Sequence, residues 1–286
     1  MDFTLQDARR QQRLRCRPFR VWRQPEGNAW MQFYRTDAGY LLRFPGLADF
    51  QIAGHEFAVT CRPAPGVQEE TSKHLFLNQV LPLVLSKRGK LVFHASAVEV
   101  KTVAAAFVAD SGRGKSTLAA SFASAGFRFL CDDGLVLEEQ GNDYQAMPSH
   151  PSIRLWQDSQ DALVGAGVQS ALPVQYTTKA RILSGDGVAF CAQPRALKRV
   201  YFLGDGSAHE PTVQRLSAVQ TLGEWVKHAF LLDPDEKTLL SAHFDRLVSL
   251  ANQLPGYHLD YPRRYDVLAA VRRVIIANIL DTNTAL

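Results

Sequence analysis

A glycine-rich segment near residue 110 has the residue types that hold polyphosphates. It reads Ala109-Asp110-Ser111-Gly112-Arg113-Gly114-Lys115-Ser116-Thr117, which fits the pattern G-x-x-x-x-G-K-S/T except that Ala109 stands at the first glycine. Small residues let backbone N–H groups turn toward phosphate oxygens, and the helix expected to follow directs its positive N-terminus at the same anion. We expect Lys115 to contact the β- and γ-phosphates of ATP and Ser116 to hold Mg²⁺. The expected cofactor-binding residues are Ser111, Gly112, Arg113, Gly114, Lys115, Ser116 and Thr117.

Two adjacent acids form a second candidate group. Asp132 and Asp133 lie in the run Cys131-Asp132-Asp133-Gly134, directly after a predicted strand. Acids at the carboxyl end of a strand lie where open α/β sheets place their ligands. One carboxylate could take the proton of an attacking hydroxyl while the other serves Mg²⁺. Asp-Asp-Gly is also an ordinary turn sequence, but its position after the loop and its helix favours a catalytic pair.

A histidine and several cations could complete such a site. His94 lies in the predicted strand that precedes the loop strand, where a lone histidine is more often a core residue than a catalyst. Phosphoryl transfer also needs cations against the charge on the moving group. Candidates in the segment expected to cover the loop are Arg154, Lys179, Arg181 and Arg195. Arg154 and Lys179 rank first as phosphate or substrate contacts.

The order of these residues resembles the catalytic domain of HPr kinase/phosphorylase. That family uses a loop containing Asp/Glu-Ser-Gly-x-Gly-Lys-Ser and a downstream Asp-Asp, as in Asp110–Ser116 and Asp132-Asp133. The runs Phe93–Val98 and Pro148–Trp156 look closer still to the HprK-related serine kinases. These include HprK-related kinase A and the kinases of lasso-peptide clusters. The resemblance covers roughly residues 75–160, and the run 254–262 is similar in character.

The resemblance implies a P-loop kinase with a fold related to phosphoenolpyruvate carboxykinase. Such an enzyme transfers the γ-phosphate of ATP, with Mg²⁺, to a serine hydroxyl of a peptide or small protein, an alcohol group as acceptor. The implied catalytic residues are His94, Lys115, Asp132 and Asp133, and the implied metal ligands are Ser116, Asp132 and Asp133. The chain lacks the glycine-containing signature of the bifunctional enzyme and does not resemble its regulatory domain. Phosphorylase activity and HPr as a substrate are therefore not implied.

Two other functions remain compatible with the same residues. The acceptor could be the hydroxyl of a small molecule, which would favour a closed apolar pocket, whereas a peptide favours an open groove. The chain could instead be a nucleotide-binding regulatory protein with little turnover, in which ATP orders nearby loops for a partner. Two acids beside Lys115 argue against this last function.

The elements around these residues predict an α/β fold in two domains. Residues 1–70 read as a small β-rich domain with strands near 19–22, 30–34, 40–44 and 57–60. Residues 71–286 read as the P-loop kinase domain. It begins with a buried helix over 72–88, and the β-loop-α-β unit that carries the loop consists of strands 91–98 and 103–108, a helix over 116–125 and a strand over 127–130. From about residue 213 we expect a C-terminal helical segment, with helices over 217–231, 234–254 and 263–280.

Composition bounds the remaining choices. The chain has 286 residues, 46% hydrophobic and 21% charged, which is typical of a globular protein. A net charge of +4 is too weak to indicate a nucleic-acid partner. No apolar run reaches a membrane span, no secretory signal is seen, and the four scattered cysteines indicate neither zinc nor disulfides. We therefore expect a cytoplasmic protein, either a monomer or a homo-oligomer. Its seven arginines between Arg9 and Arg23 form a solvated face or a surface for an acidic partner.

Overall fold

The chain folds into two compact units. The computed structural model describes residues 3–141, 143–165, 168–185 and 187–281. The first unit contains the residues up to Val84 together with Leu172–Thr178, and the second contains Leu85–Ala171 and Lys179–Leu286. The first unit thus continues past residue 70, where we expected the domain to end. A later segment also belongs to it: Gln175 accepts a hydrogen bond from the Gln68 N–H (2.9 Å) and donates its own N–H to Thr71 (3.1 Å).

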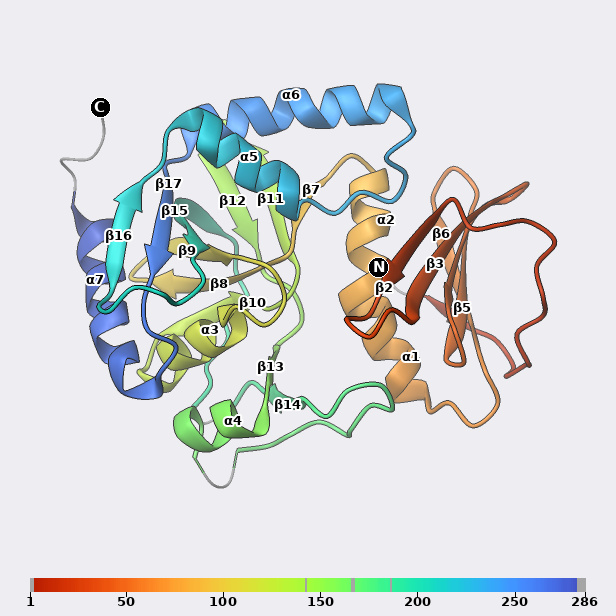
Figure 1. The fold of residues 1–286 in the computed structure, drawn as a ribbon, viewed down its shortest axis with the longest axis horizontal. Helices are drawn as coiled ribbons and strands as arrows, with labels where there is room; N and C mark the ends of the chain where they lie inside the picture. The colour runs from red at the N-terminus through yellow and green to blue at the C-terminus, as the bar shows by residue number, and fades with distance from the viewer. Residues whose placement is uncertain (1–2, 142, 166–167, 186, 282–286) are drawn as a thin grey trace. The chain divides into compact units, whose positions relative to one another are not determined.

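The first unit is built on a six-stranded sheet in the order β1-β6-β5-β4-β3-β2 (Figure 1). Its strands are β1 (Thr4–Leu5), β2 (Arg20–Arg23), β3 (Ala29–Thr36), β4 (Gly39–Phe44), β5 (Ala48–Ala53) and β6 (Ala58–Pro63). Four of them coincide with predicted strands, whereas β1 and β5 were not predicted. In β5, the burial pattern is clear. Its apolar residues, including Phe50 and Ile52, alternate with Asp49 and Gln51, so one face is buried and the other is half-buried.

The helix expected over 72–88 is divided into three parts. These are α1 (Glu69–Leu75), a π-helical turn η1 (Phe76–Val80) and α2 (Leu81–Lys87). The side-chain amide of buried Asn78 donates to the carbonyl of His74 (2.9 Å), four residues earlier. This carbonyl is the acceptor that an α-helix provides for the backbone N–H of residue 78, and such competition distorts helices.

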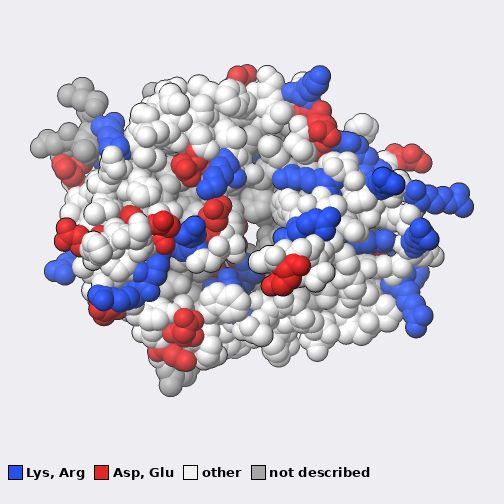
Figure 2. Space-filling view, in the orientation of Figure 1, with Lys and Arg blue, Asp and Glu red and all other residues white. Residues whose placement is uncertain are grey.

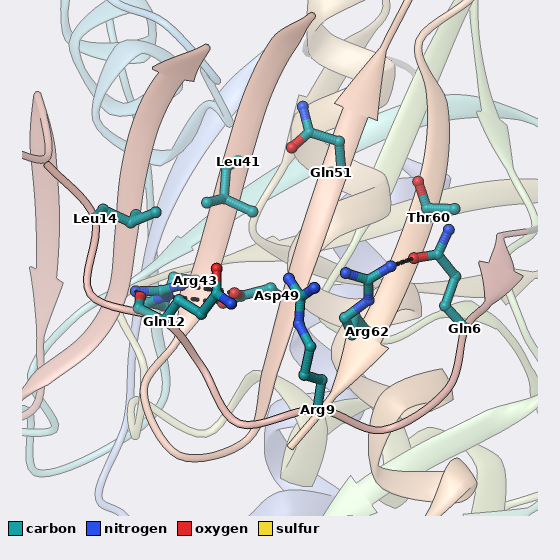
Figure 3. A pocket seen from close by; sticks show the side chains of 10 residues that line it. All are labelled: Gln6, Arg9, Gln12, Leu14, Leu41, Arg43, Asp49, Gln51, Thr60 and Arg62. Atoms are coloured by element: carbon teal, nitrogen blue, oxygen red, sulfur yellow. Dashed lines mark hydrogen bonds and ion pairs between the residues drawn. The ribbon is translucent and has the colours of Figure 1, made fainter. Parts of the chain in front are cut away.

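An arginine-lined hollow lies on the half-buried face of the first unit's sheet. The hollow has a volume of about 290 Å³, and Arg9, Arg43, Arg62 and Asp49 are among its lining residues. Figure 3 shows these side chains converging from the N-terminal segment and from β4, β5 and β6. Figure 2 shows that Lys and Arg side chains are crowded over this unit.

The second unit is built on a nine-stranded sheet. Its main path runs β10-β8-β9-β15-β12-β11-β7, with β17 paired to β15 and β16 paired to β17. The strands are β7 (Leu91–Phe93), β8 (Ala95–Val100), β9 (Val103–Val108), β10 (Arg128–Cys131), β11 (Leu135–Gln140), β12 (Asp143–Met147), β15 (Arg195–Leu203), β16 (Thr212–Arg215) and β17 (Gly256–Asp260). A separate pair consists of β13 (Ser152–Leu155) and β14 (Ala180–Leu183).

Helices cover both faces of this sheet, which explains the continuous apolar sequence of β9. They are α3 (Lys115–Ser124), α4 (Gln157–Leu163), α5 (Ala218–His228), α6 (Lys237–Gln253), the short η2 (Tyr265–Val267) and α7 (Leu268–Leu280). In Figure 1, α5 and α6 lie on one side of the sheet and α3 and α7 on the other. Accordingly, Ala106 of β9 belongs to a core with Trp225 and Leu250, and Phe107 belongs to a core with Phe122 and Ile275.

Three strands of this unit differ from our expectations. The segment from residue 213 is not purely helical, because β16 and β17 add two strands to the sheet. In the segment that we expected to cover the loop, β15 starts at Arg195 and runs through the centre of the sheet, parallel to β9. Its run Val200-Tyr201-Phe202 is fully apolar and buried, which is typical of a central strand. Within the described ranges, no helix is long and apolar enough to cross a bilayer.

Candidate active site

The sheet brings three segments of the second unit to one edge. β8 is antiparallel to both β9 and β10, so the carboxyl ends of β9 and β10 point the same way. The first residue of β8, Ala95, pairs with the last residue of β9, Val108. His94, the loop after Val108 and Asp132-Asp133 therefore meet at this edge, as expected for a ligand site of an open α/β sheet.

The loop between β9 and α3 has the backbone that its glycines permit. Gly112 and Gly114 have φ values of +83° and +90°, in the left-handed region that favours glycine. Ala109 is not among the non-glycine residues with positive φ in the described part of the chain, so its Cβ is tolerated where the motif usually has glycine. Gly114 precedes α3 and accepts from the Leu118 N–H (2.8 Å), which closes the first helical turn. The N–H groups before Leu118 have no partner within the helix and face the loop.

Lys115 is buried at the start of α3, with 5% of its surface exposed. Its Nζ donates to the carbonyls of Ala109 (2.9 Å) and Asp110 (3.1 Å). Burial lowers the pKa of Lys115 to about 8, and the neighbouring positive charge of Lys179 acts in the same direction. The fold therefore keeps an ammonium group in a place where its solvation is poor, which is typical of a group that meets an anion.

Asp132 is held by hydrogen bonds from three segments. Its Oδ1 accepts from Ser96 Oγ (2.6 Å) and from Ser116 Oγ (2.8 Å), and its Oδ2 accepts from the Arg154 N–H (2.9 Å). Only 2% of its surface is exposed. The structure thus joins Ser116, on the first turn of α3, to the first acid of the pair, and it fixes the orientation of that carboxylate.

Asp133 has a different environment. Its φ of +62° is left-handed, a conformation that costs energy for a non-glycine residue and that clusters at functional sites. Its Oδ2 forms an ion pair with the Arg154 guanidinium, and its Oδ1 lies 3.5 Å from His94 Nε2. Asp133 is 6% exposed, so this carboxylate is held beside one cation in a site with little water.

His94 is a neutral imidazole in this site. Burial, together with the positive charges of Lys115 and Arg154, lowers its pKa to about 3. Its contact with Asp133 is therefore a contact of a neutral ring with a carboxylate and not an ion pair. A base with this pKa accepts protons poorly at neutral pH. The His94 backbone N–H donates to the carbonyl of His228 (3.0 Å), which anchors the residue at the end of α5.

The structure separates the cations that the sequence suggested. Arg154 contacts both acids, and Lys179 is near enough to lower the pKa of Lys115. Arg113 is turned away from the acids, toward the carbonyl of Asp205 (3.4 Å). Arg195 forms an ion pair with Glu99 (2.5 Å), so it belongs to the sheet and not to this site.

Three residues of the site were not assigned a role from the sequence. Ser96 is on β8, two residues after His94, and its hydroxyl donates to Asp132. Lys227 and His228 come from α5 and approach the Asp110 carboxylate at 3.3 Å and 3.9 Å. Burial lowers the pKa of His228 to about 4. No local pattern marks Lys227 or His228, because only the tertiary fold brings α5 to the loop.

The donor set at this edge fits Mg²⁺ that is shared with a phosphate. The Ser116 hydroxyl and the carboxylates of Asp132 and Asp133 are hard oxygen donors, which Mg²⁺ prefers. Among the described residues, no group of three or more His, Cys, Asp and Glu side chains is arranged to hold a metal by itself. Mg²⁺ is usually bound by one or two carboxylates together with substrate phosphates, so these residues suffice.

Comparisons with known proteins leave the function to be argued from these residues. No family model matches the chain, and no curated protein matches it. Among solved structures, the Hpr(Ser) kinase/phosphatase from Coxiella burnetii is similar at 11% sequence identity and a TM-score of 0.36, over 66% of this chain and 96% of that chain. A likeness at this TM-score carries no functional argument.

Proposed function

We propose that the chain is an ATP-dependent kinase that transfers the γ-phosphate to a serine hydroxyl of a peptide or small protein. The observation that carries the proposal is the contact between the first turn of α3 and the acid pair, in which Ser116 Oγ donates to Asp132 Oδ1 (2.8 Å) beside buried Lys115. This contact joins the start of α3, after the glycine-rich loop, to the first of the two acids, and an anion-binding loop beside a carboxylate is an arrangement that supports phosphoryl transfer. The resemblance to HPr kinase/phosphorylase, read from the sequence, supports the same reaction.

The two acids have separate roles in this proposal. Asp132 is oriented toward Ser116, and these two residues would hold Mg²⁺, whose positive charge would offset the charge of the phosphates. Asp133 is the general base. Its carboxylate takes the proton of the serine hydroxyl while the serine oxygen forms a bond to the γ-phosphorus and the bond to the β-phosphate oxygen breaks, which releases ADP. His94 stays neutral and keeps Asp133 in place.

Cations around the acids would stabilise the transferring group. Lys115 would leave the carbonyls of Ala109 and Asp110 for the phosphates, because a charged acceptor forms the stronger hydrogen bond. Arg154, which already pairs with Asp133, would lie beside the group in transfer. Both cations are buried or nearly so, which strengthens their interaction with a phosphate.

A charged pocket beside the loop supports a peptide as the acceptor. This pocket, of about 540 Å³, is lined by loop residues such as Asp110 and Arg113 and by Glu224, Lys227 and His228 of α5. A site for a small metabolite is usually lined mainly by apolar side chains. The charged lining instead suits a polar peptide segment, and His228 connects the pocket to His94 through a backbone hydrogen bond.

The test is the transfer of label from γ-labelled ATP with Mg²⁺ to serine-containing peptides. We expect labelled peptide from the wild type and none from Lys115→Ala, whereas Lys198→Ala, an exposed lysine on β15, retains transfer. Label on a small-molecule hydroxyl but on no peptide would contradict the peptide acceptor. Tight ATP binding with no labelled product from any acceptor would contradict the kinase and would indicate a nucleotide-binding regulatory protein.

A further inference from the structure

A second pocket borders the loop, and three aromatic side chains are among its lining residues. It has a volume of about 220 Å³ and is lined by Gly112, Gly114 and Thr117 of the loop and by aromatic residues that include Trp156 and Tyr265. Trp156 and Tyr265 are 49% and 38% exposed, although large aromatic residues are highly buried on average. Neither Trp156 nor Tyr265 takes part in the proposed phosphoryl transfer.

The first turn of α3 separates this aromatic pocket from the acids. Ser116 Oγ is directed to Asp132 (2.8 Å), whereas Thr117 Oγ1 lies 3.2 Å from Ser159 Oγ, and Ser159 also lines the pocket. Consecutive residues of a helix lie about 100° apart around its axis. A polyphosphate that crosses the N-terminus of α3 with its last phosphate at Ser116 and Lys115 therefore leaves this turn on the Thr117 side, at the aromatic pocket.

A chain of hydrogen bonds holds the pocket to the loop. Thr117 is joined to Ser159, Ser159 Oγ lies 3.0 Å from the Tyr265 hydroxyl, and that hydroxyl donates to Asp158 Oδ2 (2.8 Å). Tyr265 is thus oriented from both sides while its ring remains partly exposed. Lys179 Nζ lies 4.9 Å from the centre of the Trp156 ring, so a cation also fixes the second aromatic.

We propose that the aromatic pocket binds the nucleoside of the nucleoside triphosphate, with its base against Trp156 or Tyr265. This assignment rests on the proposed function, which places the phosphates at Lys115 and Ser116. Exposed aromatic rings are the side chains on which nucleobases stack, independently of the base sequence. The volume is below the roughly 300–1,000 Å³ of sites that enclose a whole drug-sized ligand, as expected for a pocket that receives one end of an elongated ligand.

The experiment compares ATP with inorganic tripolyphosphate, which has the phosphates but no nucleoside. Both ligands are titrated calorimetrically, with Mg²⁺, into the wild type and into Trp156→Ala, Tyr265→Ala, Tyr265→Phe and Lys115→Ala. We expect Trp156→Ala or Tyr265→Ala to weaken ATP binding roughly 5- to 100-fold, the range found for loss of one stacked base contact. Tripolyphosphate binding should stay within about twofold of the wild type.

The Tyr265→Phe variant is the matched control, because it keeps the ring and removes the hydroxyl that bonds to Ser159 and Asp158. It should bind ATP within about threefold of the wild type if stacking is the main contribution. Equal losses for ATP and tripolyphosphate, or no loss of ATP affinity in either alanine variant, would overturn the nucleoside assignment. Lys115→Ala tests the proposed function separately, because it should weaken the binding of both ligands. Unchanged binding of both ligands would show that Lys115 does not contact the phosphates and would contradict the proposed function.

Discussion

The arginine-lined hollow of the first unit and the candidate active site of the second both contain charged side chains. They differ in how far the charge of a central cation is compensated within the fold. In the hollow, Arg43 donates to both oxygens of Asp49, at 2.8 and 2.7 Å, and to the carbonyl of Gln12 (2.8 Å). The hydrogen bonds from Arg43 to Asp49 raise the pKa of Arg43. In the active site, burial lowers the pKa of Lys115 to about 8.

This difference separates a structural charge from one kept for a ligand. Arg43 has its counter-ion within the fold, so the pair holds the N-terminal segment on the sheet, as Figure 3 shows for Gln12 and Arg43. Lys115 donates to neutral carbonyls, and its charge is offset only in part by Asp132. A cation that folding leaves poorly compensated is one that an anionic ligand can stabilise, which is the physical reason that perturbed pKa values cluster at functional sites.

The largest expected effect comes from the acid pair. Asp133→Asn should lower the transfer rate by roughly 10²- to 10⁴-fold, because it removes the general base of the proposed reaction. Asparagine tolerates the left-handed backbone of Asp133, so the fold of the loop should be kept. Steady-state transfer from labelled ATP gives the rate, and calorimetry should show ATP affinity within a few fold of the wild type.

Asp132→Asn provides the comparison within the pair. We expect it to raise the Mg²⁺ concentration needed for half-maximal transfer, since its carboxylate meets Ser116. Full transfer rates in both variants would show that neither acid is the base.

The contrast between Arg43 and Lys115 predicts opposite changes in stability. Arg43→Met should lower the free energy of unfolding by about 2 kcal/mol, because it leaves the Asp49 carboxylate without its cation. Lys115→Met should raise it by about 1 kcal/mol at pH 7. The shift of the Lys115 pKa from 10.5 to about 8 corresponds to about 3 kcal/mol, which two hydrogen bonds to carbonyls offset by about 1 kcal/mol each.

The pH dependence gives the sign of the Lys115 effect. Between pH 8 and 10.5 the unfolded chain binds the Lys115 proton and the folded chain does not, so the wild type gains stability as the pH rises through this window. The gain of about 3 kcal/mol across this window exceeds the advantage of about 1 kcal/mol at pH 7, so Lys115→Met should be less stable than the wild type by about pH 10. Denaturant unfolding at pH 7 and pH 10 measures the stability of Lys115→Met relative to the wild type at each pH. A lower stability of Lys115→Met at pH 7 would contradict the difference proposed between Arg43 and Lys115.

The next prediction, with a smaller expected effect, concerns the stability of the fold in acid and the histidines His94 and His228. Burial lowers the pKa of His94 to about 3 and that of His228 to about 4, below the usual 6.5. As the pH falls below 6.5, the unfolded chain takes up protons that the folded chain refuses, so stability decreases. Each histidine should account for about 1 to 2 kcal/mol of the loss between pH 7 and 5.

The corresponding variants are His94→Gln and His228→Gln, with His209→Gln as an exposed control. Denaturant unfolding at the two pH values should show a smaller acid loss in the first two variants only. Identical losses in all three would mean that the buried histidines are not held neutral.

Much of the fold and the site could be predicted from local patterns, and the rest depended on contacts between distant segments. The loop between β9 and α3 and the acids after β10 follow from a motif and from strand order, because they lie within 25 residues of one another. Thr117 and Tyr265 are connected only through Ser159, which no local pattern reveals. β15 was missed because its apolar run lies between glycine-rich and polar stretches that suggested loops.

The smallest expected effect concerns the exposed arginines of the first unit. If Arg13 and Arg15 only form a solvated face, Arg13→Gln and Arg15→Gln should each change stability by less than about 0.5 kcal/mol. Transfer to a short serine peptide should also be unchanged in both variants. The informative measurement is KM for an acidic acceptor protein against KM for a neutral short peptide. A KM that rises for the acidic acceptor alone would show that these arginines recognise the substrate, and the charge of the first unit would then be functional although its ion pairs are structural.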